Sequence, residues 1–302
     1  MKVTDFGFRV VKVNKKELKG KNKKREKSNI RFNQTTLCHD SCLIRHSPGK
    51  NRAIDALLVK PALGGPFGRR REKMTITEQL AYSTVRIECE MVSGGISSGS
   101  GYFFRFKDDP EKKQHVPVVI TNKHVITGAK KGKIIFTISK DGNPIDTEHF
   151  ELFIENFESF WRKHPSDDVD LCAMPIAPFL HAAEAQGKNL FYIPLDASLI
   201  PNKEKLDNLS AMEEIVMVGY PNAIWDHVNN KPIYRKGVTA THPCIDYNGK
   251  KEFMIDAACF PGSSGSPVFI LNENGYSDKN GNTYLGAKRI YLMGTLYACY
   301  HR

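Results

Sequence analysis

Three short segments of the sequence carry side chains whose types suit acyl-transfer chemistry. The segment VVITNKHVITGA presents His124 in a polar turn that follows an apolar strand. The segment DDVDLCAMPI holds Asp170 immediately before a small, apolar run, and FPGSSGSPVF holds Ser264 between Gly262 and Gly265. The order along the chain is His, Asp, Ser, with separations of 46 and 94 positions. Together these three residues are candidates for a nucleophile, its base and the group that orients the base.

Each residue type suits one step of such a reaction. A serine hydroxyl is a weak nucleophile at neutral pH and needs a neighbouring base to take its proton. Histidine suits this step because its ordinary pKa of about 6.5 lies close to working pH. A buried carboxylate then fixes the tautomer of the imidazole and stabilises the imidazolium. The N–H groups of Gly262 and Ser264 are expected to face the developing oxyanion, at about 3–4 kcal/mol for each donor.

Asp168 is a rival for the role of the carboxylate. It lies two positions before Asp170 in the same acidic run. Asp170 has the more suitable context, because residues 171–174 (LCAM) continue from it as a buried strand. The sequence therefore favours Asp170, with Asp168 as the alternative.

The segments that must position these side chains are short strands separated by turns. Residues 83–92, for example, alternate apolar and polar side chains as a half-buried strand does. The expected strands span residues 83–92, 101–106, 116–121, 132–139, 215–219, 233–241, 252–257, 267–271 and 289–296. Helical spacing appears mainly at residues 178–186 and 202–212. Many short strands with Gly and Asn turns indicate an antiparallel barrel or sandwich rather than an alternating α/β fold.

Over residues 74–302 the chain resembles the trypsin-like (chymotrypsin-fold) serine peptidases, nearest the bacterial HtrA/Deg-like branch and without a PDZ domain. The motifs that carry this resemblance are SSGSGYFF, VVITNKHVITGA, VDLCAMPI, PGSSGSPVF and YLMGTLYA. The resemblance implies an all-β fold of two packed six-stranded antiparallel β-barrels with the active site in the cleft between them. His124 and Asp170 would come from the first barrel and Ser264 from the second. It also implies a serine endopeptidase that acts on polypeptides through an acyl-enzyme intermediate.

The sequence departs from the family pattern near the nucleophile. Ser263 stands where digestive members carry an aspartate that receives a newly liberated N-terminus, so activation of that kind is not expected. Ser266 replaces the second glycine after the nucleophile, a mild change between small residues. The resemblance assigns Ala258 and Tyr297 to the primary specificity pocket. Because Ala258 is small and neutral, that pocket is expected to prefer apolar or small side chains.

The second barrel is expected to be incomplete at its C-terminal end. Members of the family usually continue beyond the strand matched by residues 289–296, and the next strand closes one wall of the specificity pocket. Here the chain stops at Arg302. An open barrel edge exposes unpaired backbone groups. Another segment or a partner would have to supply the strand, or the chain is truncated; the alternative function is a catalytically weak or inactive trypsin-fold module that binds peptides.

The charge is concentrated in the first 73 residues of the 302. Residues 1–73 carry 20 Lys and Arg against 6 Asp and Glu, whereas the rest carry 24 against 27, and the whole chain is +11 at pH 7. Residues 1–73 are therefore expected to be a mostly disordered basic segment ahead of a peptidase domain at 74–302. A solvated tail, sequence upstream of a domain that starts at Met74, and a basic arm that binds nucleic acid are the open interpretations.

Several functional classes are disfavoured. No run of about 18 apolar residues suggests a membrane span, and the N-terminus lacks a signal-peptide core. Seven cysteines, an odd number, do not suggest a disulfide framework, so reduced thiols and a cytoplasmic location are expected. No HExxH or paired-cysteine motif predicts a metal, and no glycine-rich phosphate loop predicts a nucleotide. No cofactor or membrane partner is expected; the oligomeric state stays open.

Overall fold

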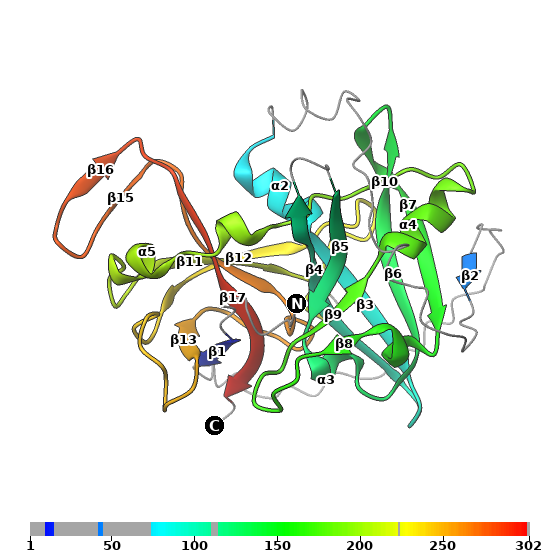
Figure 1. Ribbon diagram of the computed structural model, residues 1–302, viewed down its shortest axis with the longest axis horizontal. Helices are drawn as coiled ribbons and strands as arrows, with labels where there is room; N and C mark the ends of the chain where they lie inside the picture. Colours follow the sequence, from blue (N-terminus) through cyan, green and yellow to red (C-terminus); the bar gives the residue numbers. More distant parts are fainter. Residues whose placement is uncertain (1–9, 15–41, 45–73, 110–113, 223, 301–302) are drawn as a thin grey trace, which may run out of the picture.

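The computed structural model describes residues 10–14, 42–44, 74–109, 114–222 and 224–300. Strands dominate, and they form two β-sheet units that lie side by side, with a small hairpin projecting from the second (Figure 1). The prediction of an all-β chain built from two mainly antiparallel units is confirmed. No helix among these residues combines the length and apolarity that a membrane crossing requires.

The first unit is a nine-stranded sheet in the order β2-β7-β6-β3-β4-β5-β9-β8, with β10 paired to β6. Its strands are β2 (Cys42–Ile44), β3 (Thr84–Met91), β4 (Ile96–Asp109), β5 (Gln114–Thr121), β6 (Ala129–Lys140), β7 (Asn143–Glu155), β8 (Arg162–Lys163), β9 (Cys172–Pro175) and β10 (Leu190–Phe191). This unit was expected to hold six strands. The additional three, β2, β8 and β10, are no longer than three residues each and extend or flank the longer ones.

The second unit is a closed barrel of six strands in the order β1-β13-β12-β11-β14-β17. Its strands are β1 (Val10–Asn14), β11 (Glu214–Gly219), β12 (Ile233–Thr239), β13 (Glu252–Asp256), β14 (Pro267–Asn272) and β17 (Arg289–Tyr300). The projecting hairpin is formed by β15 (Gly275–Ser277) and β16 (Thr283–Leu285).

Short helices connect the strands. They are α2 (Ile76–Ser83), α3 (Lys123–Ile126), η3 (Phe157–Phe160), α4 (Ala177–Glu184), η4 (Ala197–Leu199) and α5 (Lys203–Asp207). Helix α2 begins with a capping box, in which Thr75 and Glu78 bond reciprocally to each other's main-chain N–H groups. Helices α4 and α5 fall where helical spacing was predicted.

Three apolar clusters hold the fold together. Two of them fill the interiors of the first and second units. The third lies between the units, where Tyr102 and Phe104 of β4 join a cluster with Val218 of β11 and Phe269 of β14. Within this interface the Tyr102 hydroxyl and Thr295 Oγ1 are 2.9 Å apart, and both side chains are buried. The interface therefore fixes how the two units present their facing loops.

Strand β1 closes the second barrel, as Figure 1 shows where it lies beside β13 and β17. It pairs in parallel with both neighbours. The sequence analysis left open whether another segment, a partner or nothing would supply the missing strand. In the structure another segment of the same chain, β1, supplies it. The predicted disordered segment 1–73 contains the strands β1 and β2, and its other residues lie outside the described ranges.

Candidate active site

His124 lies on the one-turn helix α3, directly after β5. Val125 and Ile126 on the same turn are buried in the core of the first unit, so the helix is fixed by its apolar side. The His124 side chain is left 49% exposed on the opposite side. The buried residue Asn122, which precedes the helix, donates from Nδ2 to the Asp170 main-chain oxygen at 2.7 Å.

Asp170 contacts His124 through both carboxylate oxygens. Nδ1 of the imidazole lies 2.5 Å from Oδ2, and the His124 main-chain N–H donates to Oδ1 at 3.1 Å. Strand pairing explains the approach: Thr121, the last residue of β5, is opposite Cys172, the first residue of β9. The residues just beyond these two strand ends are therefore neighbours. The structure therefore brings together the two residues that the sequence analysis predicted as base and orienting carboxylate.

Asp168 lies elsewhere. Its side chain is 79% exposed, and its carboxylate is 3.5 Å from the Lys250 ammonium. Within the part of the chain that the structure describes, it makes no hydrogen bond to His124. Of the two rival carboxylates, Asp170 alone contacts the imidazole.

Ser264 lies on the loop between β13 and β14, which is bonded to both units. Its carbonyl accepts a hydrogen bond from the Ser100 N–H of β4 at 2.8 Å. The next residue, Gly265, donates to the Leu296 carbonyl of β17, also at 2.8 Å. Gly265 has a φ of +86°, and a Cβ there would lie 1.9 Å from the Ser100 oxygen, so only glycine fits this crossing.

The Ser264 loop and the His124 helix meet across Gly99. A Cβ placed on Gly99 would lie 2.6 Å from a Val125 methyl and 3.4 Å from the Ser264 carbonyl oxygen. The Ser264 loop and the residue after His124 therefore flank the same point of β4. Among the described residues, the Ser264 hydroxyl makes no hydrogen bond to His124. In ligand-free sites such bonds are often long and tighten when substrate binds.

The main-chain N–H groups of Gly262 and Ser264 are the predicted donors of an oxyanion hole. The Pro261 carbonyl accepts a hydrogen bond from the Asn222 N–H at 2.7 Å, which fixes the orientation of the Pro261–Gly262 peptide. In a trans peptide the N–H points away from the C=O, so the Gly262 N–H faces away from Asn222. Neither this N–H nor that of Ser264 donates a hydrogen bond to any described residue. Within the described part of the chain, both predicted donors are therefore unoccupied.

The two residues assigned to the specificity pocket lie on segments next to β1. Ala258 is exposed on the loop that follows β13. Tyr297 is half-buried on β17, and its hydroxyl donates to the Glu252 carboxylate of β13 at 2.7 Å. The pairing between β1 and β17 passes from Leu296 to Ala298, so Tyr297 is the extra residue of a bulge.

Asn222, Ser100 and Asn122 were not singled out from the sequence, although they position the site. The Ser100 hydroxyl donates to the Gly262 carbonyl at 2.9 Å and accepts from the Tyr220 N–H at 2.8 Å. These are links between side chains and distant main-chain groups. The small-residue run ahead of GYFF is the only local signal that points to one of them.

Cys89 and Cys172 are free thiols that lie in the core of the first unit. Burial raises the pKa of Cys172, and the nearby Asp170 carboxylate raises it further. Burial also raises the pKa of Cys89 to about 12. A thiol that stays protonated at neutral pH is a poor nucleophile. Neither core thiol therefore competes with Ser264 for the role of nucleophile.

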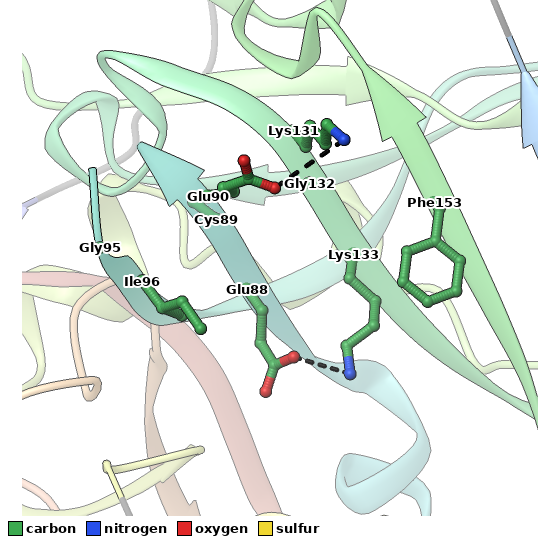
Figure 2. Close-up of a pocket in the computed structure, with 9 residues that line it drawn as sticks. All are labelled: Glu88, Cys89, Glu90, Gly95, Ile96, Lys131, Gly132, Lys133 and Phe153. Atoms are coloured by element: carbon green, nitrogen blue, oxygen red, sulfur yellow. Dashed lines mark ion pairs between the residues drawn. The ribbon is translucent and has the colours of Figure 1, made fainter. Parts of the chain in front are cut away.

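A surface pocket of about 490 Å³ lies over β3, β6 and the start of β4 (Figure 2). Its charged side chains are paired with one another: Glu88 with Lys133 at 2.8 Å, and Glu90 with Lys131 at 4.0 Å. None of the predicted site residues lines it. Across the described part of the chain, no cluster of three His, Cys, Asp or Glu side chains is arranged to hold a metal ion.

Comparison with known proteins finds a matching family. The model of the trypsin-like peptidase domain matches residues 99–275, more than half of the chain. Solved structures with similar folds include an inactive form of Rv3671c from M. tuberculosis H37Rv (13% identity, 78% of this chain and 91% of that chain, TM-score 0.32). Others are a tobacco etch virus protease mutant (14%, 71% and 77%, 0.37) and the thermostable serine protease AL20 from an extremophilic microorganism (13%, 72% and 92%, 0.33). None of the curated proteins matches the chain. The match of the family model over residues 99–275 shows that the chain belongs to the trypsin-like peptidase domain family.

Proposed function

We propose that this protein is a serine endopeptidase that hydrolyses peptide bonds with His124, Asp170 and Ser264. The observation that carries the proposal is the double contact between His124 and Asp170, 2.5 Å at Nδ1 and 3.1 Å at the main-chain N–H. Because Nδ1 is held by the carboxylate, Nε2 is the nitrogen left to exchange protons with a nucleophile.

In the proposed mechanism, Ser264 Oγ attacks the scissile carbonyl and passes its proton to His124 Nε2. The N–H groups of Gly262 and Ser264 stabilise the oxyanion of the tetrahedral intermediate. His124 then protonates the leaving amine, which yields the acyl-enzyme. A water molecule, deprotonated by the same nitrogen, releases the acid and restores the Ser264 hydroxyl.

The finer features of the proposal come from single positions. A small, neutral Ala258 supports a preference for apolar or small side chains at the cleaved bond. The sequences of the motifs around His124, Asp170 and Ser264 favour the HtrA/Deg-like branch. The odd number of cysteines, together with the free core thiols of Cys89 and Cys172, favours a reducing compartment, the cytoplasm. Nucleic-acid binding through residues 1–73 remains a prediction from charge alone.

One observation favours a second candidate function, a trypsin-fold module that binds peptides without cleaving them. In the described part of the site, the Ser264 hydroxyl and the His124 imidazole are not joined by a hydrogen bond. If binding of a peptide did not bring them together, the site would hold a substrate without activating the nucleophile.

Turnover of a peptide library separates the two functions. The full chain is expected to cleave a subset of peptides, and Ser264→Ala is expected to retain those peptides without cleaving them. The matched control, Ser263→Ala, removes the neighbouring hydroxyl and should still cleave. Retention without cleavage by the unaltered, folded chain would favour the binding module instead.

A further inference from the structure

The slot between β13 and β17 is an unusual feature of the second barrel. The two strands run in the same direction, because β1 is parallel to both. β1 is far from both β13 and β17 in the sequence. Neither of these strands therefore forms a hairpin with the strand that fills the slot. Without β1, the facing edges of β13 and β17 would present unpaired N–H and C=O groups.

The slot binds β1 through main-chain pairing along its whole length. Val10 to Val13 are opposite Glu252 to Ile255 on one side. On the other side, Val10 to Asn14 are opposite residues between Thr295 and Tyr300. Addition of an extended segment to open sheet edges is a general mode of peptide recognition, in which the main chain supplies the affinity. Here the segment inserts between two edges at once.

The slot is directly connected to the nucleophile loop. Val11 is opposite Leu296, whose carbonyl accepts from the Gly265 N–H at 2.8 Å and whose N–H donates to the Ser266 carbonyl at 2.9 Å. Leu296 therefore holds the two residues that follow Ser264. On the other side of the slot, β13 leads into the loop that carries Ala258 and Ser264.

A side-chain contact also joins the two edges of the slot. The Tyr297 hydroxyl of β17 donates to the buried Glu252 carboxylate of β13 at 2.7 Å. The bulge at Tyr297 occurs in the pairing with β1, so the strand that fills the slot also determines where this residue departs from the ladder.

We propose that the slot between β13 and β17 is a binding site for one extended peptide segment, that residues 10–14 of the same chain are its occupant, and that occupancy holds the Ser264 loop in its catalytic form. The link to catalysis rests on the proposed peptidase function, whereas the strand-binding site does not. Removal or displacement of residues 10–14 then opens the barrel, releases Leu296 and switches the site off. Because the ligand is tethered, its effective concentration at the slot is high.

The test uses Val11→Pro in the full chain, with Val11→Ile as the matched control. In a parallel ladder every residue of β1 bonds to one neighbour or the other, so proline at position 11 removes one ladder donor. Hydrogen exchange reports on the amides of β13 and β17, and labelling by a fluorophosphonate probe reports on Ser264. Val11→Pro is expected to lose protection in both strands and to lose labelling, whereas Val11→Ile should keep both.

A second pair of variants tests the slot as a binding site. Deletion of residues 1–14 is compared with deletion of residues 1–9, which keeps β1. A synthetic peptide of residues 8–16 should restore protection and labelling to the first deletion, and a peptide with proline at position 11 should not. A further outcome is that the deletion of residues 1–14 and Val11→Pro fail to fold altogether. If the deletion of residues 1–9 and Val11→Ile do fold, that result also supports a requirement for β1 in the second barrel.

Two results would overturn the inference. Equal protection of β13 and β17 in Val11→Pro and Val11→Ile would show that β1 does not fill the slot. Loss of protection with unchanged labelling would show that the slot is not coupled to Ser264. Failure of the unaltered chain to label, with protection still dependent on Val11, would count against the peptidase function and leave the strand-binding site in place.

Discussion

The Asp170 carboxylate holds His124 at two points, the imidazole Nδ1 at 2.5 Å and the main-chain N–H at 3.1 Å. One contact sets the rotation of the ring, and the other fixes the start of helix α3. The buried Asn122 amide, bonded to the Asp170 main-chain oxygen at 2.7 Å, adds a third link between the same two segments. The first unit therefore presents the imidazole in one orientation before any substrate arrives.

Replacement of Asp170 tests this relationship. In Asp170→Asn the amide NH₂ can donate to Nδ1, so the imidazole proton moves to Nε2. A protonated Nε2 cannot accept the proton of the Ser264 hydroxyl. We expect kcat on a peptide substrate to fall by about 10⁴-fold with the fold intact. Asp168→Asn, which alters only an exposed pair with Lys250, should change kcat by less than about twofold. Equal losses in the two variants would contradict the assignment of Asp170.

Replacement of Gly262 tests the proposed oxyanion hole. Gly262 has a φ of +88°, and a Cβ there would lie 2.5 Å from Asn222 Oδ1 and 2.7 Å from its main-chain nitrogen. Gly262→Ala is therefore expected to turn the Pro261–Gly262 peptide and lower kcat by about 10²–10³-fold, the typical effect of losing one donor.

The matched control for this variant is Gly281→Ala. Gly281 has a φ of +83° but no atom within 4 Å of the added Cβ, so it carries the same backbone strain without the clash. In chemical denaturation Gly281→Ala should lose only the stability that the strain costs, whereas Gly262→Ala should lose more because of its clash with Asn222. Only Gly262→Ala should lose activity, and a comparable loss in Gly281→Ala would attribute the effect to strain rather than to the N–H group.

Much of the fold could be predicted from local pattern. The strands around residues 83–92, 116–121 and 267–271 lie within two residues of their predicted bounds, because alternation or a short apolar run marks each one. Strand β7 was missed because its first half, NPIDTE, is polar and only its second half alternates. Strand β1 was missed because VVKVN lies in a basic segment and becomes a strand only through partners at the far end of the chain.

The candidate site, like the fold, could be predicted only in part. His124 and Asp170 could be found from motif and spacing, and the structure places them in contact. The support around them could not be found in this way. Asn222 acts through its main-chain N–H, which every residue except proline has, so its identity carries no signal. The Ser100 hydroxyl acquires its role only when the two units pack and bring it to Gly262.

Glu158 makes stability depend on pH near the site. The hydrogen bond from Lys163, and then the one from the Gly128 N–H at 2.7 Å, hold the pKa of Glu158 below its ordinary value. A carboxylate whose pKa is lowered by folding stabilises the folded chain when the pH is above its ordinary pKa. That stabilisation is lost as the pH falls through the lower pKa of the folded state. Glu158→Gln should therefore be less stable than the unaltered chain at pH 7, by no more than about 1 kcal/mol, and the difference should shrink as the pH falls below the ordinary pKa of a glutamate.

Urea denaturation at a series of pH values measures this difference. The control is Glu184→Gln, an exposed residue of α4 whose carboxylate makes no ion pair or hydrogen bond to any described residue. Its stability should follow that of the unaltered chain at every pH. A deficit in Glu158→Gln that stayed unchanged as the pH was lowered to full protonation of the carboxylate would show that the carboxylate charge is not its cause.

The most direct test of the account is labelling of the full chain with an alkyl fluorophosphonate, followed by mass spectrometric location of the adduct. The account predicts one adduct on Ser264, its disappearance in Ser264→Ala and His124→Ala, and its persistence in Ser263→Ala. A folded chain that takes up no probe, or that is labelled at an unchanged rate in His124→Ala, would contradict the proposal that His124 activates Ser264.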